Sequence, residues 1–537
     1  MQSNLSRLER TSESQMQLNV LSDGDVLIAV TTLRQVVESC LGPTGRCKLI
    51  HNNMGGHVTM TSSAARLLQA SQITNPVLRL VVTGILKHSE QHGDGGTMTA
   101  TLALLIIETA LKFAEDINVH LIVDVLDVVA QECVAFLSTD ETCKSRTALT
   151  FDGLTDLLRV VDGVTSTKSA CGIFAKTDAV HINRLIVQAF LKTMPSCTVK
   201  HDAQKVEGVQ YLCVEGRPFH DSHLVDGLLI EAPHIPAYER YAPLAMKTIE
   251  TGPYHGCISV VLYNISMAGD HSDHLSAAFE ISSDLNIDET VVARMLDAVT
   301  GIISLGVGLV LCQKVIHPKV KHHLRRSGVL VFDRLGLVNI NSAQQLIGII
   351  PISSFLMPVQ SDHIGHISDI TRVIIGKKCY VRLHRKEAPE NNAVCTLVLC
   401  GPMEESLEEL KHLCFVSNHV LQQAVTCPVA LVGSGEWQRD LAHHLRSLDD
   451  VCLADWSRQL DCSKTDVHKV VELVAQCLER ICSVVSGNTF SELDCDISAA
   501  VESNEVLDVL SPVIGIIKTA FHIAHTSLSI AHYITNV

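Results

Sequence analysis

The chain of 537 residues has few aromatic side chains, because 2 Trp, 7 Tyr and 12 Phe make up only 4% of it. Aliphatic residues are abundant instead, since 47% of the sequence is hydrophobic and the mean hydropathy is +0.25. A core of Val, Leu, Ile and Ala favours extensive packing of helices. The length exceeds what one hydrophobic core usually holds, so we expect about two to four domains.

Positive charge is also scarce. The chain has 42 Lys and Arg against 58 Asp and Glu, a net charge of −16. This balance disfavours nucleic-acid binding, which depends on neutralising phosphates. The one dense basic run is Lys319–Arg326, and a solvated helix face is favoured over a binding patch there.

No uninterrupted apolar run of membrane-spanning length is evident. Residues Met1–Leu21 are polar and lack the apolar centre of a secretory signal. The most apolar C-terminal stretch, Val513–Ala531, is interrupted by Lys518, His522 and His525. Its apolar residues recur at helical spacing, which predicts a buried amphipathic helix. We therefore expect a soluble protein without membrane insertion.

The spacing of Cys and His residues matches neither a zinc-binding motif nor a disulfide framework. The 19 cysteines are scattered, and the closest pairs, Cys395/Cys400 and Cys477/Cys482, are a poor fit to zinc knuckles. We expect reduced, mostly buried thiols in the cytosol. The 27 histidines are dispersed and form no HExxH pattern, and no Walker-type glycine loop occurs.

The predicted secondary structure is helical at both ends of the chain and mixed α/β in the middle. The first 147 residues look helical, and short helices at Leu154–Val161 and Ile182–Thr193 flank a connector, Val164–Lys168. Strand-length runs surround a helical segment at Glu289–Ile303. These runs are Val209–Val214, Leu228–Ile230, Ile258–Tyr263, Val307–Cys312, Gly328–Phe332, Val373–Ile375, Cys379–Leu383 and Ala393–Cys400. Beyond Gly401 the chain looks helical again, so the two ends form one domain and an α/β middle is inserted in it.

A glycine-rich turn, His92–Ala100, precedes a very apolar segment, Leu102–Ala114. Glycines there let the backbone approach an anion, and the N–H groups of the first helical turn would face it. Asp94 is placed to hold a divalent cation. From local physics alone, a turn that only caps a buried helix is the commoner interpretation.

A second turn, Leu41–Lys48, follows an amphipathic segment whose apolar residues share one helical face. Ser22 or Asp23 is the expected N-cap of that helix, and Gly42 its C-terminal stop. The two turns together resemble the nucleotide-binding motifs of group II chaperonins, LGPKGMDK and GDGTT.

Further landmarks extend the resemblance over essentially the whole chain. They are Val209–Glu215 with Leu228–Glu231, Gly306–Lys314, the return strand Thr396–Gly401, and the late glycine loop Val432–Glu436. Within the family, the run Leu309–Pro318, the opening Ser6–Glu9, and His51–Asn52 followed by Gly55–Gly56 resemble the Bardet–Biedl chaperonin-like branch.

The resemblance implies an α+β multi-domain fold with helical equatorial, small intermediate and α/β apical domains. The expected segments are 1–147 and 402–537 equatorial, 148–205 and 373–401 intermediate, and 206–372 apical. The polar stretch Ser266–Asp284 stands where the family carries a lid, and we interpret it as an altered or flexible protrusion.

The resemblance also implies a nucleotide site, with Asp94 as the Mg ligand. The residues carried over are Gly42, Pro43, Gly45, Lys48, Gly93, Asp94, Gly95, Gly96, Thr97, Gly433, Ser434 and Gly435. Two interpretations stay open: these turns bind ATP and Mg weakly, or the glycines serve only the turns.

Several departures from the family pattern concern residues that ATP hydrolysis requires. Ser63 stands where the family has an acid, and Leu410–His419, which should supply another, contains no Asp or Glu. Thr44 replaces a Lys, Cys47 an Asp, and Gly96 the first Thr of GDGTT. Losing one positioned acid or base costs roughly 10²–10⁴ in rate. We therefore expect little or no ATP hydrolysis, and no catalytic residue is assigned.

The resemblance implies a chaperonin-like protein that assists assembly of the BBSome for ciliary trafficking. Its implied partners are other Bardet–Biedl chaperonin-like proteins, cytosolic chaperonin subunits and BBSome subunits, in the cytoplasm and at the centrosome or ciliary basal body. The alternative is an ATP-hydrolysing ring chaperonin that folds clients directly. A scaffold with the same fold and no client-handling role is a third interpretation.

Overall fold

The computed structural model describes residues 14–18, 24–42, 45–51, 58–114, 117–139, 143–168, 171–173, 175–194, 208–231, 254–269, 287–355, 359–386, 393–487 and 506–536. Some predicted features lie outside these ranges. They are Ser6–Glu9, Ser22, Asp23, Pro43, Thr44, Asn52, Gly55, Gly56 and residues 270–284 of the predicted protrusion.

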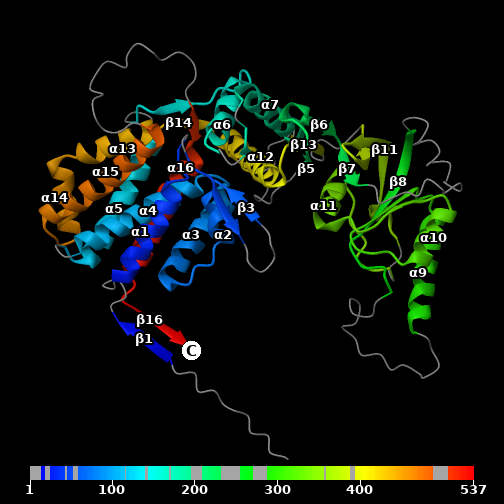
Figure 1. Cartoon of the computed structure of the whole chain (residues 1–537), viewed down its shortest axis with the longest axis horizontal. Coiled ribbons are helices and arrows are strands. Elements are labelled where there is room, and N and C mark those ends of the chain that lie inside the picture. The colour runs from blue at the N-terminus through cyan, green and yellow to red at the C-terminus, as the bar shows by residue number, and fades with distance from the viewer. Residues whose placement is uncertain are drawn as a thin grey trace, which may run out of the picture. The chain divides into compact units, whose positions relative to one another are not determined.

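The chain divides into two compact units, and the second is an insertion in the first. The first contains Met1–Ile186 and Met403–Val537, and the second contains Val187–Pro402. Figure 1 shows the elements of both. The finer division into equatorial, intermediate and apical segments stays a prediction.

The first unit is mostly helical. Its helices are α1 (Gly24–Glu38), α2 (Ala64–Ala70), α3 (Pro76–His92), α4 (Gly96–Phe113), α5 (Val119–Ser138), α6 (Thr155–Thr165), α12 (Glu404–Thr426), α13 (Glu436–Arg446), α14 (Asp450–Gln459), α15 (Lys464–Ser486) and α16 (Leu510–Leu528), and α7 (Lys176–Thr193) begins in it. Helix α4 contacts α1, α3, α15 and α16 and lies at the centre of the core (Figure 1). It is the one described helix with the length and apolar composition of a membrane span, but 67% of it is buried, as in a core helix.

Local sequence sets where these helices begin and end. Asn75 caps α3 by accepting hydrogen bonds from the N–H groups of Val77 and Leu78, at 2.9 and 3.2 Å. Pro76 at the first helical position suits the fixed φ of proline. Gly93, at φ +77°, ends the helix in a conformation that disfavours other residues.

Three small sheets accompany the helices. Strands β2 (Lys48–His51) and β3 (Val58–Thr61) form an antiparallel hairpin. A three-stranded antiparallel sheet has the order β15-β14-β4, with β15 at Leu507–Val509, β14 at Val429–Val432 and β4 at Arg146–Ala148. Strands β1 (Ser14–Leu18) and β16 (His532–Asn536) pair antiparallel near the two chain ends.

The second unit contains two sheets. The smaller has the order β5-β13-β6, with β5 at Val209–Glu215, β13 at Cys395–Gly401 and β6 at His223–Asp226. The larger has the order β10-β9-β8-β11-β12-β7. Its strands are β10 (Leu330–Phe332), β9 (Leu309–Cys312), β8 (Tyr254–Tyr263), β11 (Ile364–Ile375), β12 (Lys378–His384) and β7 (Leu228–Glu231). Two 3₁₀ turns lie at Phe219–Asp221 and Ser361–His363.

Helices cover both faces of the six-stranded sheet. Successive residues of β9 alternate between two cores, with Leu309 and Leu311 in one and Val310 and Cys312 in the other. Helix α11 (Gly336–Ile347) packs in the first core, and α9 (Ile287–Ser304) and α10 (Pro318–Arg326) pack in the second. Strands buried on both faces are continuous apolar runs, which is why the sequence revealed β9.

The fold class predicted from sequence is confirmed: the chain is a mixed α+β, multi-domain protein. The C-terminal apolar stretch is helix α16, and it is buried, as expected. The described cysteines are all free thiols. The predicted connector was partly wrong, because Val164 and Thr165 continue α6.

The expected segment boundaries do not coincide with the sheets. The break at 372/373 falls inside β11, which pairs with β8 and β12, so residues up to His384 share the larger sheet. Strands β5 and β6 lie after residue 205 but pair with β13. The polar residues Asp369, Thr371 and Arg372 concealed β11, although Asp369 is buried and interacts with Arg382.

Candidate functional site

The glycine-rich turn between α3 and α4 is held from three sides. His88 Nε2 lies 3.1 Å from the carbonyl oxygen of Asp94, and Gln423 Nε2 donates to the carbonyl oxygen of His92 at 2.7 Å. Gly95, at φ +79°, is the N-cap of α4. A Cβ at Gly93 would clash with the His419 ring. Glycine is therefore required by conformation and by space.

The turn after α1 is equally tight. The N–H of Gly45 donates to the carbonyl oxygen of Gly42 at 3.0 Å, and that of Arg46 to the carbonyl oxygen of Ser39 at 2.8 Å. Gly42 has φ +78°, and a Cβ there would lie 2.9 Å from the carbonyl oxygen of Val484. The predicted helix stop at Gly42 was wrong, because α1 already ends at Glu38 and turn hydrogen bonds from Cys40 and Leu41 carry the chain on to Gly42. Glycine is needed at position 42 for the turn itself.

The late glycine loop connects β14 to α13. Ser434 has φ +58° and Gly435 has φ +96°, so the chain turns sharply before α13 begins. The N–H of Gly433 donates to the carbonyl oxygen of Val506 at 2.9 Å, which fixes the loop against the segment leading into β15.

The three turns border one cavity of about 370 Å³ in the helical unit, within the size range of ligand pockets. The residues from the predicted site that line it are Gly42, Asp94, Gly95, Thr97 and Ser434. A smaller, adjoining cavity of about 70 Å³ is lined by Gly93, Asp94, Gly96 and Thr97 among others. Motifs separated by more than 300 residues in sequence therefore meet in space.

The other predicted residues do not line either cavity. Lys48 instead donates from Nζ to the carbonyl oxygen of Arg46, at 3.1 Å. Gly45, Gly433 and Gly435 belong to the turns but face other parts of the backbone. A Cβ at Gly45, for example, would lie 2.5 Å from the carbonyl oxygen of Cys40. Pro43 lies outside the described residues.

The smaller cavity contains the positions where the family pattern has acids. Ser63 lines it, at the N-cap of α2, and its N–H donates to Thr61 Oγ1 at 3.0 Å. From the segment Leu410–His419 of α12, the lining side chains are those of His412, Leu413, Phe415 and Val416. None of these four carries a carboxylate.

Glu409, one residue before that segment, is a site residue that the sequence did not reveal. It lines the smaller cavity, yet its carboxylate is already engaged. Oε1 accepts hydrogen bonds from Thr61 Oγ1 at 3.0 Å, from the Ser62 N–H at 2.9 Å and from Ser62 Oγ at 3.2 Å. Oε2 pairs with Arg66. Glu409 is therefore a buried anchor between α12 and the start of α2.

Three further charged residues, also missed from sequence, line the larger cavity, and one of them, Asp162, accepts a hydrogen bond from Asn183 Nδ2 at 3.0 Å. Lys168 borders both cavities and supplies a positive charge near Asp94. Asp508 accepts a hydrogen bond from Trp437 Nε1 at 3.0 Å. Burial raises the pKa of Asp508 to about 6, and the neighbouring Asp94 carboxylate adds to that rise.

His412 lines the smaller cavity on the α12 side. Burial lowers the pKa of His412 to about 4, so its ring is neutral at pH 7. A neutral imidazole is a weak substitute for a carboxylate that must hold a metal or orient water.

The residues present fit the phosphate groups of a nucleotide. The glycine turns leave room for a close approach by the backbone, and the first turn of α4 presents N–H groups that no N-cap side chain covers. Asp94 would hold Mg together with phosphate oxygens, as one carboxylate commonly does. The described residues contain no cluster of three His, Cys, Asp or Glu that could hold a metal ion unaided.

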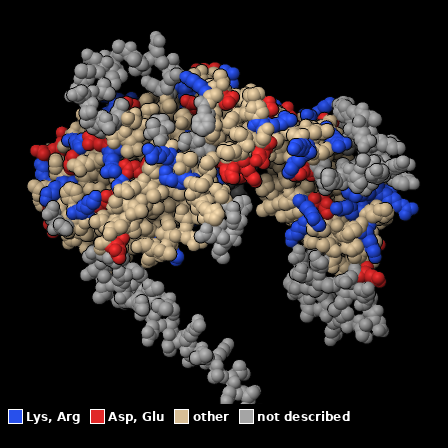
Figure 2. All heavy atoms as spheres, in the orientation of Figure 1, with Lys and Arg blue, Asp and Glu red and all other residues tan. Residues whose placement is uncertain are grey.

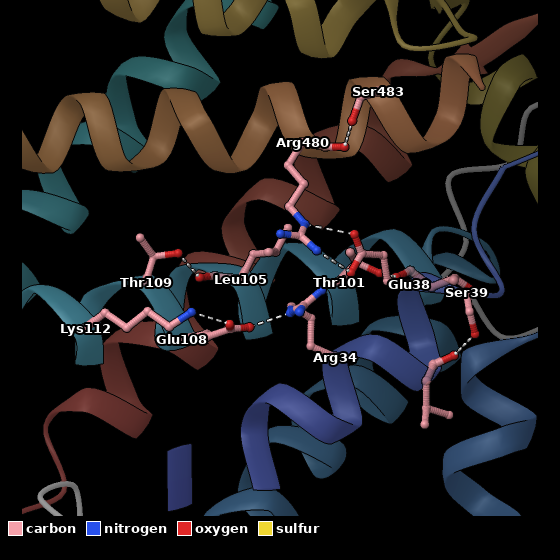
Figure 3. Close-up of polar contacts among 12 residues, drawn as sticks. Arg34, Glu38, Ser39, Thr101, Leu105, Glu108, Thr109, Lys112, Arg480 and Ser483 are labelled. Atoms are coloured by element: carbon pink, nitrogen blue, oxygen red, sulfur yellow. Dashed lines mark hydrogen bonds and ion pairs between the residues drawn. The ribbon is translucent and has the colours of Figure 1, made fainter. Parts of the chain in front are cut away.

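A buried network of charges ties together the helices that carry the turns. Arg34 of α1 pairs with Glu108 of α4 and with Glu38, and Arg480 of α15 donates to Glu38 at 2.9 Å (Figure 3). The C-terminal end of α1 and the N-terminal end of α4 lead directly to the cavity. The network holds the C-terminal half of α1 against α4 and α15.

Comparison with known proteins agrees with this arrangement. The sequence profile of the TCP-1/cpn60 chaperonin family matches residues 33–495. Molecular chaperone MKKS of Mus musculus is 29% identical over 478 residues, which cover 89% of this chain and 80% of the relative. The Homo sapiens protein of the same name is 28% identical over 484 residues, with the same coverage.

A more distant relative is thermosome subunit alpha of Sulfolobus acidocaldarius, 23% identical over 433 residues, covering 78% of this chain and 73% of the relative. The run Leu309–Pro318 resembles the McKusick–Kaufman syndrome protein, and the two relatives named MKKS agree with that resemblance.

Proposed function

The chain belongs to the TCP-1/cpn60 chaperonin family, and we propose that it is a chaperonin-like assembly protein without an ATP-hydrolysis cycle of its own. The observation that carries the proposal is the chemistry of the smaller cavity. Ser63 and the uncharged side chains of α12 stand where active members supply acids. Glu409, the nearest carboxylate on α12, is held by Arg66 and three hydrogen bonds.

Hydrolysis of ATP needs a metal, a group that orients the attacking water, and stabilisation of charge on the transferred phosphoryl group. Asp94 would hold the metal, and Lys168 with the first turn of α4 would face the phosphates. No free carboxylate among the cavity residues from α2 and α12 is left to orient water. The residues therefore support weak nucleotide binding, and they do not support efficient turnover.

Release of phosphate from Mg-ATP by the purified chain tests this proposal. We expect no sustained turnover above the level of an Asp94→Asn variant, a substitution of nearly equal size that removes the carboxylate for Mg. Turnover that depends on Mg and disappears in Asp94→Asn would overturn the proposal in favour of an ATP-hydrolysing ring chaperonin. Turnover that persists in Asp94→Asn would identify a contaminating ATPase.

Binding of nucleotide is measured separately, with a fluorescent ATP analogue. We expect weak, Mg-dependent binding that is lost when Gly95 is replaced by Ala, because a Cβ there would lie 2.7 Å from Ile516 Cδ1 in a left-handed conformation. Equal signals from both proteins would mean that the glycines serve only the turns.

We further propose that the assembly handled is the BBSome, in the cytoplasm and near the centrosome and ciliary base. The support is the resemblance to the Bardet–Biedl branch and to relatives named molecular chaperone MKKS. The expected partners are Bardet–Biedl chaperonin-like proteins, cytosolic chaperonin subunits and BBSome subunits. Capture of newly made BBSome subunits by the tagged chain tests this, and capture no greater than that of an unrelated protein of similar charge would favour a scaffold without clients.

A further inference from the structure

One segment of the second unit has a charge opposite to that of the chain, although the unit as a whole, Val187–Pro402, is nearly neutral with 19 Lys and Arg against 20 Asp and Glu. Residues 287–386 contain 13 Lys and Arg but 6 Asp and Glu, a net charge of +7, whereas the whole chain carries −16. Such a local reversal means that the positive residues are concentrated rather than interspersed. Figure 2 shows blue spheres gathered over α10 and the neighbouring strands.

Helix α10 concentrates this charge on one face. Val320 and Leu324 are fully buried and fix the helix on the sheet. Lys319, His322 and Arg326 follow one another at helical spacing on the opposite side, and all three are exposed. A helix of nine residues is about 13 Å long. We call this face, with the adjoining Lys314 and Arg334, the α10 basic strip.

Two loop residues extend the strip at the start of the helix. Lys314 and Arg334 are exposed, and the N–H of Arg334 donates to the carbonyl oxygen of Lys314 at 2.9 Å, which holds the two residues together. Asp333 neutralises one neighbouring cation, Lys321, at 2.7 Å. Lys319 and Arg326 have no ion-pair partner among the residues that the structure describes.

The charge of Lys319 interacts unfavourably with the dipole of α10. Lys319 lies in the first turn of α10, where the helix dipole is positive, and that turn contains no acidic residue. A cation there costs roughly 0.3–1 kcal/mol relative to a neutral residue. Stability of the helix does not explain Lys319, whereas attraction of a negatively charged partner does.

We propose that the α10 basic strip docks an acidic segment of another polypeptide. The inference rests on the proposed handling of other proteins, and it names the chemistry of what is bound. A strip of about 13 Å matches roughly four residues of an extended chain.

Two other anionic partners fit less well. Single-stranded nucleic acid is usually held by aromatic residues that stack on its bases, and α9 and α10 contain no aromatic ring of Phe, Tyr or Trp. A membrane-binding helix inserts its apolar face, and the apolar residues of α10 are committed to the core.

The test uses the full chain and a fluorescein-labelled peptide of about twelve residues rich in Asp and Glu. Its binding is measured by anisotropy against a peptide in which Asn and Gln replace the acids. We expect binding of the acidic peptide alone, weakening between about 50 and 300 mM salt. The double variant Lys319→Glu/Arg326→Glu should bind about tenfold more weakly.

The matched control is Lys87→Glu/Arg458→Glu, which makes the same change in net charge in the first unit. Lys87 and Arg458 have side chains that are 72% and 76% exposed. The control should bind like the unmodified protein, and both variants should retain the circular dichroism spectrum and the cooperative thermal melting of the folded chain. Equal weakening in both variants would show that only net charge matters and would overturn the proposal.

Duplex DNA and vesicles containing phosphatidylserine complete the experiment. Tighter binding of either one than of the acidic peptide, lost with Lys319→Glu/Arg326→Glu, would also overturn the proposal. If the double variant loses the peptide but still captures BBSome subunits, acidic docking is not how those clients are held. The proposed assembly function would then survive without this inference.

Discussion

Arg34 of α1 and Glu108 of α4 form an ion pair inside the helical unit, where the two residues are only 3% and 5% exposed. Glu108 also accepts a hydrogen bond from Lys112 at 2.6 Å, and Arg34 also pairs with Glu38 (Figure 3). Opposite charges alternate along this chain of contacts, so each buried group has a partner. Removing Arg34 would leave the buried Glu108 and Glu38 carboxylates with only the half-exposed Lys112 and Arg480 as charge partners.

We expect Arg34→Met to destabilise the helical unit by about 3–5 kcal/mol, the usual cost of breaking a buried pair from one side. Arg480→Met, which removes a half-exposed partner of the same network, should cost about 1 kcal/mol or less. Urea unfolding followed by circular dichroism measures both variants. Similar losses for the two would contradict the view that burial determines the cost.

The clash between Gly93 and His419 predicts a partial rescue. Gly93→Ala should destabilise the protein, because φ is +77° and the new Cβ meets the His419 ring. The positive φ alone should cost at least the roughly 1–2 kcal/mol of a left-handed residue, because Gly93 has ψ −44°, outside the left-handed helical region. Adding His419→Ala should recover the steric part of the loss and leave the conformational part. Thermal melting of the single and double variants checks this, and full recovery would show that the backbone can adopt another conformation.

The contacts of Glu409 predict strong coupling with Arg66. Glu409→Ala leaves the Arg66 guanidinium and the two hydroxyl groups without their acceptor. In a double-mutant cycle with Arg66→Ala, we expect a coupling free energy of about 0.5–3 kcal/mol. Urea unfolding of the four proteins provides the measurement. A coupling energy near zero would mean that solvent replaces the ion pair without loss.

Asp508 predicts a pH dependence of stability. Its pKa is raised to about 6 by burial, above the value of about 3.9 in an unfolded chain. The folded protein therefore binds the proton more tightly. The contribution is fully present below pH 4 and is lost as pH rises through 6, by about 2–3 kcal/mol.

The measurement is the difference in unfolding free energy between the unmodified protein and Asp508→Asn, from pH 4.5 to 8. Because Asn cannot ionise, the variant should gain relative stability as pH rises. A difference that does not change with pH would show that Asp508 titrates normally. Trp437→Phe, which removes the hydrogen bond to Asp508, should raise the pKa further and shift the change to higher pH.

Sequence patterns predicted the elements that repeat a simple period and the turns that need glycine. The helical face Val26, Val30, Val37 and the apolar run of β9 are read directly from spacing. Gly42, Gly93 and Gly95 were found because positive φ and close packing leave no other residue type. The fold class and the three turns of the cavity follow from such features.

Sequence could not predict contacts between residues that share no local pattern. Glu409 and Arg66 are separated by 343 positions, and only the packing of α12 on α2 and β3 brings them together. Lys168 and Asp508 lie in short segments without periodicity. Strand β11 was mostly missed because buried Asp369 interrupts its apolar pattern, and its interaction with Arg382 exists only once the sheet forms.

The insertion of one unit within the other has a consequence for biosynthesis. The helical core needs α13 to α16, which the ribosome makes last. The apolar faces of α1 to α5 therefore stay exposed while more than 200 intervening residues are translated. A premature stop codon anywhere before residue 403 leaves α4 without α15 and α16. Nonsense mutations in the inserted half should therefore yield aggregating fragments rather than a functional helical remnant.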